Sequence, residues 1–257
     1  MSSFKNFSKK LIKNCGRAIG ISNLLATEVG KNNLGVRETW LKDTLTKIPS
    51  GSRILDAGAG QLQYKPYCSH LMYVSQDFGK YDGQGDGRGL QSSRWDQSGL
   101  DIVCDITKIP ESDASFDAVM CIEVLEHLPD PVNAIRELVR LLKPSGHLIV
   151  TAPFCSLTHQ APYFFQTGYS RYFYEYWLNE FGLSIIDMQH NGNYFGYLAQ
   201  EIRRLPTIAR QYSNQTLNLY EEWSLRILLA SLGRLSSAGQ ASDQLLSFGL
   251  HILAYKN

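Results

Sequence analysis

The stretch that decides the fold occupies residues 53–61 and reads R-I-L-D-A-G-A-G-Q. Its first half is a short apolar run, which predicts a buried β-strand. Gly58 and Gly60 follow directly. Glycines at that point leave the main chain bare where a strand turns towards a helix, so a ligand can approach the backbone N–H groups closely. Because such a glycine pair also occurs by chance, its meaning depends on the rest of the chain.

Strand-like and helix-like segments alternate after this motif. Apolar runs that predict further strands occupy residues 71–77, 100–105, 116–122, 147–152, 183–187 and 246–255. Asp130 and Pro131 predict the start of a helix, because Asp is a good N-cap and Pro suits the first helical position. A mostly helical insert is predicted at 193–242, broken by Pro206, before the last strand. The pattern predicts an α/β fold with a doubly wound, mostly parallel sheet of seven strands.

Acidic residues end two further predicted strands. Asp77 ends the second strand 19 residues after Gly58, where such folds place a carboxylate that binds ribose hydroxyls. Asp105 and Ile106 end the third, and their carboxylate and backbone N–H can recognise adenine. Each acid could instead cap a helix, but three suitable strand ends in order favour a nucleoside site. Gln63 stands where a dinucleotide-binding loop needs its third glycine, which argues against NAD.

Composition excludes several classes of protein. The chain has 257 residues, of which 44% are hydrophobic and 19% charged, and its formal net charge is +1. A core can therefore form, and a protein built mainly to bind nucleic acid is not expected. We find no apolar run of about 18 residues and no secretory signal, so a cytoplasmic protein is expected. The five cysteines, an odd number at wide spacing, predict reduced thiols.

The first residues form a segment of their own. Lys5, Lys9, Lys10, Lys13 and Arg17 precede any acidic side chain. Apolar residues recur at helical spacing over 4–18, which predicts an amphipathic helix. Such a helix could rest on an anionic membrane surface or pack its apolar stripe on the domain. We expect a helical segment over 1–48 and one catalytic-type domain over 49–257.

Several motifs together resemble the class I S-adenosylmethionine-dependent methyltransferases. They are R-I-L-D-A-G-A-G, Y-V-S-Q-D, C-D-I-T-K-I-P, S-F-D-A-V-M-C-I-E-V-L-E-H-L-P-D-P and L-L-K-P-S-G-H-L-I-V-T-A-P-F, in this order over about residues 50–155. The resemblance implies that the last strand of the sheet runs antiparallel. Gln61 departs from the small residue that many members carry and leaves the expected cofactor unchanged.

The resemblance also implies which residues meet S-adenosylmethionine. The methionine part would be lined by residues of the first strand and its loop, Asp56, Gly58, Ala59 and Gly60. Asp77 would hold the ribose, and Asp105 and Ile106 the adenine. The residues below the sulfonium would be Cys121, Ile122 and Glu123.

Two histidines follow predicted strand ends near the expected methyl group. His127 or His159 could serve as a base, which is needed when the acceptor is a hydroxyl that must lose a proton. Glu123, Glu126, His127 and His159 could together hold a divalent metal ion with mixed N and O ligands. A similar E-x-x-E-H with a later histidine holds a metal in small-RNA 3′-end methyltransferases and, in part, in ubiquinone-pathway O-methyltransferases. Three alternatives stay open: the metal, a metal-free His159 base, or no proton transfer by either histidine.

Aromatic residues crowd the segment 156–182, which we expect to be a lid whose rings mostly serve packing. Tyr163 and Arg171 are the residues of this lid expected to bind the acceptor. The segment loosely resembles methyltransferases found with bacterial surface-glycan enzymes, which favours O-methylation of a saccharide or another small-molecule hydroxyl. The alternatives are an RNA-end 2′-O-methyltransferase with a metal site and a non-catalytic cofactor-binding module. The oligomeric state is left open.

Overall fold

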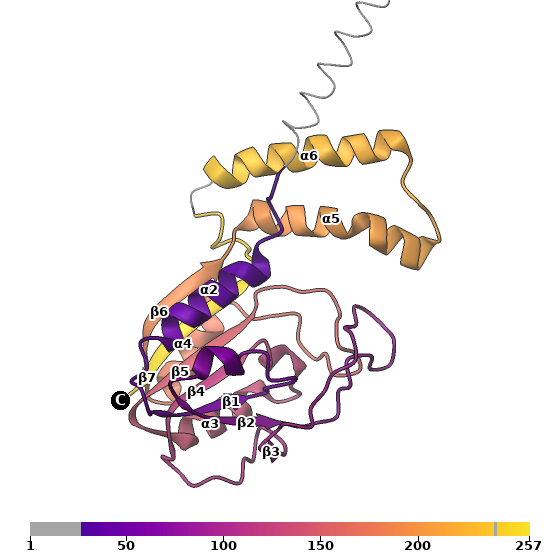
Figure 1. Cartoon of the computed structure of the whole chain (residues 1–257). Coiled ribbons are helices and arrows are strands. Elements are labelled where there is room, and N and C mark those ends of the chain that lie inside the picture. Colours follow the sequence, from indigo (N-terminus) through magenta and orange to yellow (C-terminus); the bar gives the residue numbers. More distant parts are fainter. Residues whose placement is uncertain (1–26, 239–240) are drawn as a thin grey trace, which may run out of the picture. The chain divides into compact units, whose positions relative to one another are not determined.

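The computed structural model of the chain, drawn in Figure 1, describes residues 27–238 and 241–257. Asn33–Gly192 and Leu246–Asn257 form one compact unit, and residues 27–32 with 193–245 form a second. The amphipathic helix expected at residues 4–18, together with Cys15, lies outside the described residues. The other four cysteines, Cys68, Cys104, Cys121 and Cys155, are free thiols, as predicted.

The larger unit is built on a seven-stranded sheet. In chain order its strands are β1 (Arg53–Ala57), β2 (Met72–Asp77), β3 (Ile102–Val103), β4 (Phe116–Ile122), β5 (Leu142–Pro153), β6 (Leu183–Asn191) and β7 (Gly249–Lys256). The spatial order is β3-β2-β1-β4-β5-β7-β6, and β7 runs antiparallel to both neighbours. The predicted sheet with its reversed last strand is confirmed. The order reverses between β1 and β4, where open α/β sheets bind ligands.

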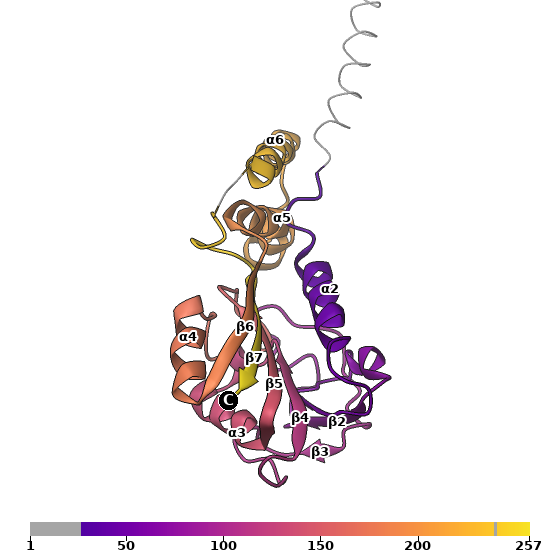
Figure 2. The ribbon, with the colours of Figure 1, turned by 90° about the vertical axis from the view of Figure 1, so that its left-hand side faces the viewer.

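Helices cover both faces of this sheet. Figure 2 shows α2 (Asn33–Leu45) on one side, and α3 (Pro131–Leu141) and α4 (Arg171–Glu180) on the other. The side chains of β4 alternate between the two faces: Val119 and Cys121 pack in the core on the α3 side, and Ala118 and Met120 in the core on the α2 side. Burial on both faces explains why β4 reads as a continuous apolar run.

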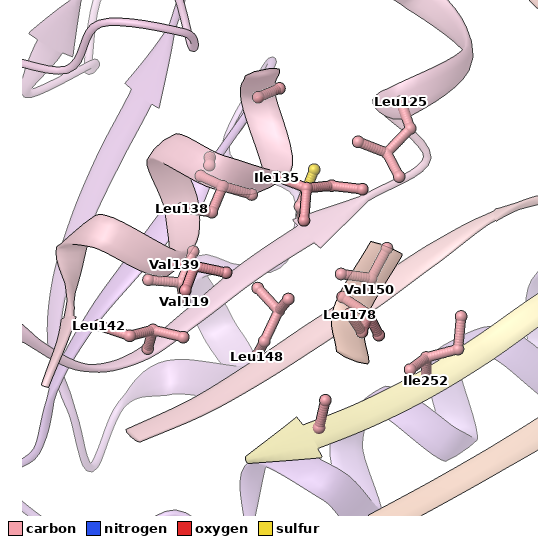
Figure 3. Packing of buried hydrophobic residues seen from close by; sticks show 14 of the residues in the cluster. Val119, Leu125, Ile135, Leu138, Val139, Leu142, Leu148, Val150, Leu178 and Ile252 are labelled. Carbon is pink, nitrogen blue, oxygen red and sulfur yellow. The ribbon is translucent and has the colours of Figure 1, made fainter. Parts of the chain in front are cut away.

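The core on the α3 side is the larger of these two. Figure 3 shows Ile135 and Leu138 of α3 directed at the strands, with Val119 and Leu148 opposite them. The start of α3 is as predicted: the Asp130 side chain accepts a hydrogen bond from Asn133 N at 3.0 Å, and Pro131 is the first helical residue. Two short 3-10 turns, Lys65–Cys68 and Leu125–His127, complete the unit.

Five predicted strands have different bounds in the structure. β2 begins one residue later than predicted, at Met72, β5 covers Leu142–Pro153 instead of 147–152, and β7 covers Gly249–Lys256 instead of 246–255. The other two are β3 and β6. β3 keeps only Ile102–Val103 of the predicted 100–105, because the Asp101 carboxylate binds Ser75 N and Ser75 Oγ instead of continuing the strand pairing. β6 continues beyond the predicted residue 187 to Asn191, because its pairing with β7 extends to Gly249.

The second unit contains the helices α5 (Tyr194–Ser213) and α6 (Leu219–Ala238). Ala199 of α5 packs against Leu229 and Leu232 of α6, with Val29 beside them. The prediction that Pro206 breaks this region is wrong: α5 runs through Pro206 and ends at Asn214, whose φ is 52°. A proline removes one helix hydrogen bond, and the remaining bonds carry α5 past it. Within the described residues, we find no helix with the length and apolar content needed to cross a bilayer.

Candidate active site

A cavity of about 750 Å³ opens at the carboxyl ends of β1, β2 and β4, at the point where the strand order reverses. It is lined by most of the residues that the sequence singled out: Gly58, Ala59, Gly60, Asp77, Asp105, Ile106, Ile122, Glu123, His127, His159 and Tyr163. A cavity of this size lies in the usual range for cofactor sites.

The loop after β1 explains why glycine is needed there. Gly58 has φ 81°, and a Cβ on it would lie 2.4 Å from the side chain of Val124. Gly60 has φ 53°, and a Cβ on it would lie 2.9 Å from the ring of Trp95. Both positions combine a left-handed backbone with close packing, which only glycine tolerates well. The loop therefore presents bare main chain to the cavity.

Asp77 is fixed by the loops on either side of it. Its Oδ2 accepts a hydrogen bond from Gly60 N at 3.0 Å, and its Oδ1 accepts one from Gly79 N at 2.8 Å and one from Gln97 Nε2 at 3.3 Å. A carboxylate can accept about four hydrogen bonds. Asp77 thus ties the β1 loop to the β2 loop and keeps capacity for a ligand hydroxyl.

Asp105 lies at the same rim, beside Ile106. Its Oδ1 accepts both Thr107 N, at 2.9 Å, and Thr107 Oγ1, at 2.8 Å. These hydrogen bonds, that of the backbone first, hold the pKa of the Asp105 carboxyl below its ordinary value. Because both bonds use Oδ1, Oδ2 can accept a hydrogen bond from a ligand.

Asp56 and Cys121 do not line the cavity, contrary to the prediction. The Asp56 side chain is buried and accepts a hydrogen bond from the Tyr73 hydroxyl at 2.6 Å. Cys121 is fully buried in the core on the α3 side. Both residues lie within a strand, where alternation directs the side chain to a covered face of the sheet instead of beyond the strand end.

Glu123 has an unusual backbone and two fixed partners. Its φ is 56°, in the left-handed region that non-glycine residues rarely adopt. Its Oε1 accepts a hydrogen bond from Thr151 Oγ1 at 2.8 Å, and its Oε2 pairs with Arg37 Nη1 at 2.8 Å. The predicted role of Glu123 as a metal ligand is not supported, because the group of possible ligands that the structure brings together does not include it.

Glu126, His127 and His159 form a compact group of possible ligands. One ligand atom from each lies within 4.8 Å of the others. Glu126 Oε1 is 3.7 Å from His127 Nε2 and 3.8 Å from His159 Nε2. Glu126 is completely buried, and neither of its carboxylate oxygens has a hydrogen-bond partner among the described residues. A buried carboxylate without partners needs an explanation, and a bound cation would supply one.

The two histidines are oriented for ligation by their other ring nitrogens. Nδ1 of His127 is 2.6 Å from the carbonyl oxygen of Tyr163, and Nδ1 of His159 is 2.9 Å from that of Leu157. A carbonyl only accepts, so each Nδ1 carries the proton and each Nε2 presents a lone pair. Carbonyl acceptors behind the rings are the usual support of histidine ligands.

Burial sets the charge states of this group. It raises the pKa of Glu126 well above its ordinary value, and the nearby charge of Glu123 adds to the effect. Burial and, second, His159 lower the pKa of His127 to about 4, so its imidazole is neutral. The three residues fit a divalent cation with N and O ligands, because the cation would favour the ionised carboxylate and neutral imidazoles bind metals.

Two loops that are distant in the sequence join beside His159. Leu90 N donates to Thr158 O, and Gln160 N donates to Leu90 O, both at 2.9 Å, so the bonds flank His159. Gly89 makes this approach possible: a Cβ on it would lie 2.5 Å from Thr158 O. The glycine-rich loop after β2 therefore supports the segment that carries His159.

The aromatic segment divides between site and core. Tyr163 and Phe165 line the cavity, whereas Tyr169 and Tyr174 are buried in the core on the α3 side. Arg171 does not line the cavity, contrary to the prediction. It begins α4 and pairs with Glu175, with Nη2 2.6 Å from Oε1.

The structure adds residues that sequence reasoning missed. Arg37 of α2 lines the cavity, and its buried Nε has no hydrogen-bond partner among the described residues. Trp95 and Tyr81 line it from the glycine-rich loop, with their rings edge to face at 4.9 Å. The glycines signalled a loop, but no pattern indicated which of its aromatic residues, or which arginine of α2, would reach the site.

Known proteins with similar sequences match the central part of the chain. Residues 55–150 match a family described as "Methyltransferase domain". The ubiquinone biosynthesis O-methyltransferase of Marinobacter nauticus is 43% identical over 47 residues, which are 18% of this chain and 20% of that protein. The protein of the same name from Xanthomonas oryzae pv. oryzae is 56% identical over 41 residues, or 16% of this chain and 17% of that protein. The chain thus spans at most about a fifth of the length of these curated relatives.

A solved structure supports the fold over a longer range. A SAM dependent methyltransferase from Archaeoglobus fulgidus aligns with 85% of this chain and 94% of its own, at 13% identity and a TM-score of 0.51. This likeness concerns the fold. Together with the family match, it confirms the resemblance predicted from the motifs.

Proposed function

We propose that this chain, whose residues 55–150 belong to the methyltransferase domain family and whose sheet has the class I methyltransferase fold, transfers a methyl group from S-adenosylmethionine to a hydroxyl oxygen. The observation that carries the proposal is the group of Glu126, His127 and His159, in which both histidines line the cavity and the buried Glu126 lies behind them. Methyl acceptors differ in whether they must lose a proton, and a hydroxyl is the kind that needs such a group.

The cavity offers suitable partners for each part of the cofactor. Asp77 would accept hydrogen bonds from ribose hydroxyls, and Asp105 Oδ2 with Ile106 N would recognise adenine. The methionine carboxylate would lie near Arg37, whose buried Nε lacks a partner among the described residues. Glu123, held by Arg37 and Thr151, would bind the amino group of the same moiety.

Glu126, His127 and His159 would hold a divalent ion, which supplies a Lewis acid that lowers the pKa of an acceptor hydroxyl. The residues act in two further ways. Tyr163 O and Leu157 O fix the protonated Nδ1 atoms, so both Nε2 atoms remain directed at Glu126. Phe165 and Tyr163 line the cavity and would shield the bound reactants from water.

Alignment is the main task of the protein in this reaction. The cofactor supplies a sulfonium methyl group with a good leaving group, so the protein needs to position the acceptor oxygen in line with it. Burial keeps the His127 imidazole neutral, so its Nε2 would be able to accept the hydroxyl proton, and His159 lines the cavity beside it. This role needs no metal, and the two possibilities are separable by experiment.

The acceptor class is inferred from the relatives and from the side chains that line the cavity. Both relatives are named O-methyltransferases, which agrees with a hydroxyl acceptor. We propose a small molecule, with a saccharide as the first candidate, because the cavity is lined by aromatic side chains such as Tyr163, Trp95 and Phe165. Aromatic rings stack well on sugar faces and on phenolic rings.

The test measures cofactor binding and methyl transfer separately. Calorimetry with S-adenosylmethionine should show binding, and release of S-adenosylhomocysteine should follow with saccharides or phenols as acceptors. Short RNA with a free 3′ end belongs in the same panel. Transfer to RNA alone would replace the small-molecule proposal, and binding without transfer to any acceptor would favour a non-catalytic module. Lack of binding would refute the whole proposal.

His159→Ala tests the catalytic group. We expect turnover to fall by about 100-fold or more, with little change in the affinity for S-adenosylmethionine, because His159 belongs to the acceptor side. His70→Ala is the matched control, since His70 binds Leu45 O and does not line the cavity. Full activity of His159→Ala would remove this residue from the mechanism.

Removal of metal by a chelator distinguishes a metal-dependent mechanism from one in which a histidine acts as the base. We expect elemental analysis of the purified protein to find a divalent metal that is lost in Glu126→Gln, and chelation to abolish activity until the metal is restored. Glu175→Gln is the control, because Glu175 pairs with Arg171 away from the cavity. Activity that survives complete removal of metal would leave the histidines as bases only.

A further inference from the structure

The second unit exposes apolar side chains along one face of α6. Tyr220, Trp223 and Ile227 are 86%, 42% and 56% exposed. Their spacing of three and four residues places them on one side of the helix. Leu229 and Leu232, which pack against Ala199 of α5, occupy the opposite side. Arg234 lies seven residues after Ile227 and continues the same row. We call these four residues, Tyr220, Trp223, Ile227 and Arg234, the outward stripe.

The charge of the outward stripe is positive. Arg234 belongs to it, and Arg226 lies beside it, with its guanidinium 5.9 Å from the centre of the Trp223 ring. The acidic residues of α6, Glu221 and Glu222, are also exposed, but their positions lie about 100° or more around the helix from those of Tyr220, Trp223 and Ile227. Aromatic, aliphatic and cationic side chains together are typical of helices that lie at a lipid–water interface.

Further positive charge occurs in the sequence that precedes Thr27, a residue close to α6. Thr27 lies against α6, because a Cβ on Gly233 would be 2.6 Å from Thr27 Oγ1. Residues 1–26 are joined to Thr27 and contain Lys5, Lys9, Lys10, Lys13 and Arg17 but no Asp or Glu. The basic sequence is thus attached beside the helix that carries the outward stripe.

We propose that the outward stripe of α6 binds an anionic lipid surface, with the basic residues of the first segment adding electrostatic attraction. Charge decides between the possible occupants. The segment 1–26 and the stripe carry charge of the same sign, so they would repel each other and would both be attracted by anionic lipid. A second copy packed stripe to stripe would likewise bring arginines together. Trp223 and Tyr220 can insert their rings at the headgroup level.

The test uses the full chain and vesicles of phosphatidylcholine with or without phosphatidylglycerol. We expect the protein to sediment with the anionic vesicles, and added salt to weaken this binding because surface electrostatics are screened. Trp223→Ser with Ile227→Ser should lower the affinity for anionic vesicles by about tenfold or more, since the apolar contact is lost. Methyl transfer to a soluble acceptor should not change, because the stripe is remote from the cavity in sequence.

The matched control is Leu228→Ser with Leu235→Ser. These leucines are 44% and 36% exposed on the same helix, but lie about 100° around it from the stripe. The control should bind vesicles like the wild type. Three outcomes would overturn the proposal. The two double variants could lose the same affinity for vesicles, the stripe variant could bind vesicles as the wild type does, or the wild type could bind no vesicles. Light scattering that shows a dimer which only the stripe variant dissociates would also overturn it, because the partner would then be a second copy.

Discussion

Two buried carboxylates in this protein differ in the partners that surround them. Asp56 is 1% exposed and accepts a 2.6 Å hydrogen bond from the Tyr73 hydroxyl. Glu126 is 0% exposed and has no such partner among the described residues. A partnered buried acid is part of the structure, whereas an unpartnered one beside two imidazole lone pairs is suited to bind a cation. Partners, and not burial alone, separate a structural acid from a candidate ligand.

The environment of Asp56 makes stability depend on pH. Burial raises the pKa of Asp56 to about 7, partly opposed by the hydrogen bond from Tyr73. Between about pH 4, the ordinary value for Asp, and pH 7, the folded protein therefore binds more protons than the unfolded chain. Below that interval Asp56 makes its full contribution to the free energy of unfolding. As the pH rises through the interval, this contribution falls by roughly 4 kcal/mol.

Asp56→Asn should remove this dependence. We expect the free energy of unfolding of the variant to fall less between pH 4 and 7 than that of the wild type, measured by urea denaturation. Asp101→Asn is the control with the opposite sign, because hydrogen bonds from Ser75 lower the pKa of Asp101. Asp101→Asn should change the slope of the unfolding free energy against pH only in more acidic solution, where wild-type Asp101 becomes protonated. Identical pH profiles for Asp56→Asn and the wild type would contradict the assignment.

Asp77 tests the cofactor assignment at the level of a single residue. Asp77→Ala should weaken binding of S-adenosylhomocysteine by about 1–3 kcal/mol, the usual loss when charge-assisted hydrogen bonds are removed. The variant also loses the bond to Gly60 N, so Asp77→Asn, which can keep that bond, should show a smaller loss. Asp96→Ala is the calorimetric control, since this acid binds Ser98 N and does not line the cavity. Equal affinities in all variants would exclude the ribose role.

Among the secondary-structure elements, those with strong local patterns were predictable. β4 matches the predicted bounds because both of its faces are buried, which produces a continuous apolar run. The start of α3 follows from the cap chemistry of Asp130 and Pro131. β3 was overestimated, because a long-range bond between Asp101 and Ser75 ends the pairing. Pro206 misled the prediction, because neighbouring hydrogen bonds can carry a helix past one proline.

The sequence allowed prediction of the site residues that lie at the ends of strands. It did not allow prediction of those that come from other elements. Asp77, Asp105 and Glu126 follow strands or their loops, so the topology brings them to one edge. Arg37 comes from α2, and its position depends on the packing of Trp40 and Leu41 against the sheet. Asp56 and Cys121 were predicted from their proximity in sequence to the strand ends, but their side chains are buried against the faces of the sheet and do not line the cavity.

The glycine-rich loop after β2 offers a prediction about an element. A Cβ on Gly89 would lie 2.5 Å from Thr158 O, so Gly89→Ala should push the loop away from the segment that carries His159. A displacement of about 1 Å in an active site can cost about 100-fold in rate. We expect Gly89→Ala to lower kcat by up to about that factor, with a nearly unchanged Kd for S-adenosylmethionine.

Gly87→Ala is a matched control for this substitution. Gly87 has φ 74° and Gly89 has φ 68°, but a Cβ on Gly87 would meet no atom within 4 Å. Both variants therefore carry the same cost of a left-handed alanine, and only Gly89→Ala disturbs the contact with Thr158. Steady-state kinetics should show a kcat near the wild-type value for Gly87→Ala. Equal losses in the two variants would mean that backbone strain, and not the support of His159, explains the effect.

At the scale of the whole molecule, the candidate site and the proposed lipid-binding stripe belong to different compact units. The cavity is lined by residues between Arg37 and Phe165, all in the larger unit. The outward stripe belongs to α6 in the second unit. Catalysis and attachment can therefore be changed separately by substitution, which is what the two sets of variants above require.

Amide hydrogen exchange can test this division in one experiment. A ligand that binds only the folded site stabilises it by about 2.7 kcal/mol at 100 times its Kd. Exchange that requires opening of the site should then slow by about 100-fold. With S-adenosylhomocysteine we expect slower exchange at the amides that surround the cavity, such as Gly60, Ile106 and Val124, and unchanged exchange in α5 and α6. With anionic vesicles we expect slower exchange in α6 and unchanged exchange at the amides around the cavity. Protection of α6 by the nucleoside ligand alone would show that the second unit takes part in cofactor binding, and the separation of roles would be wrong.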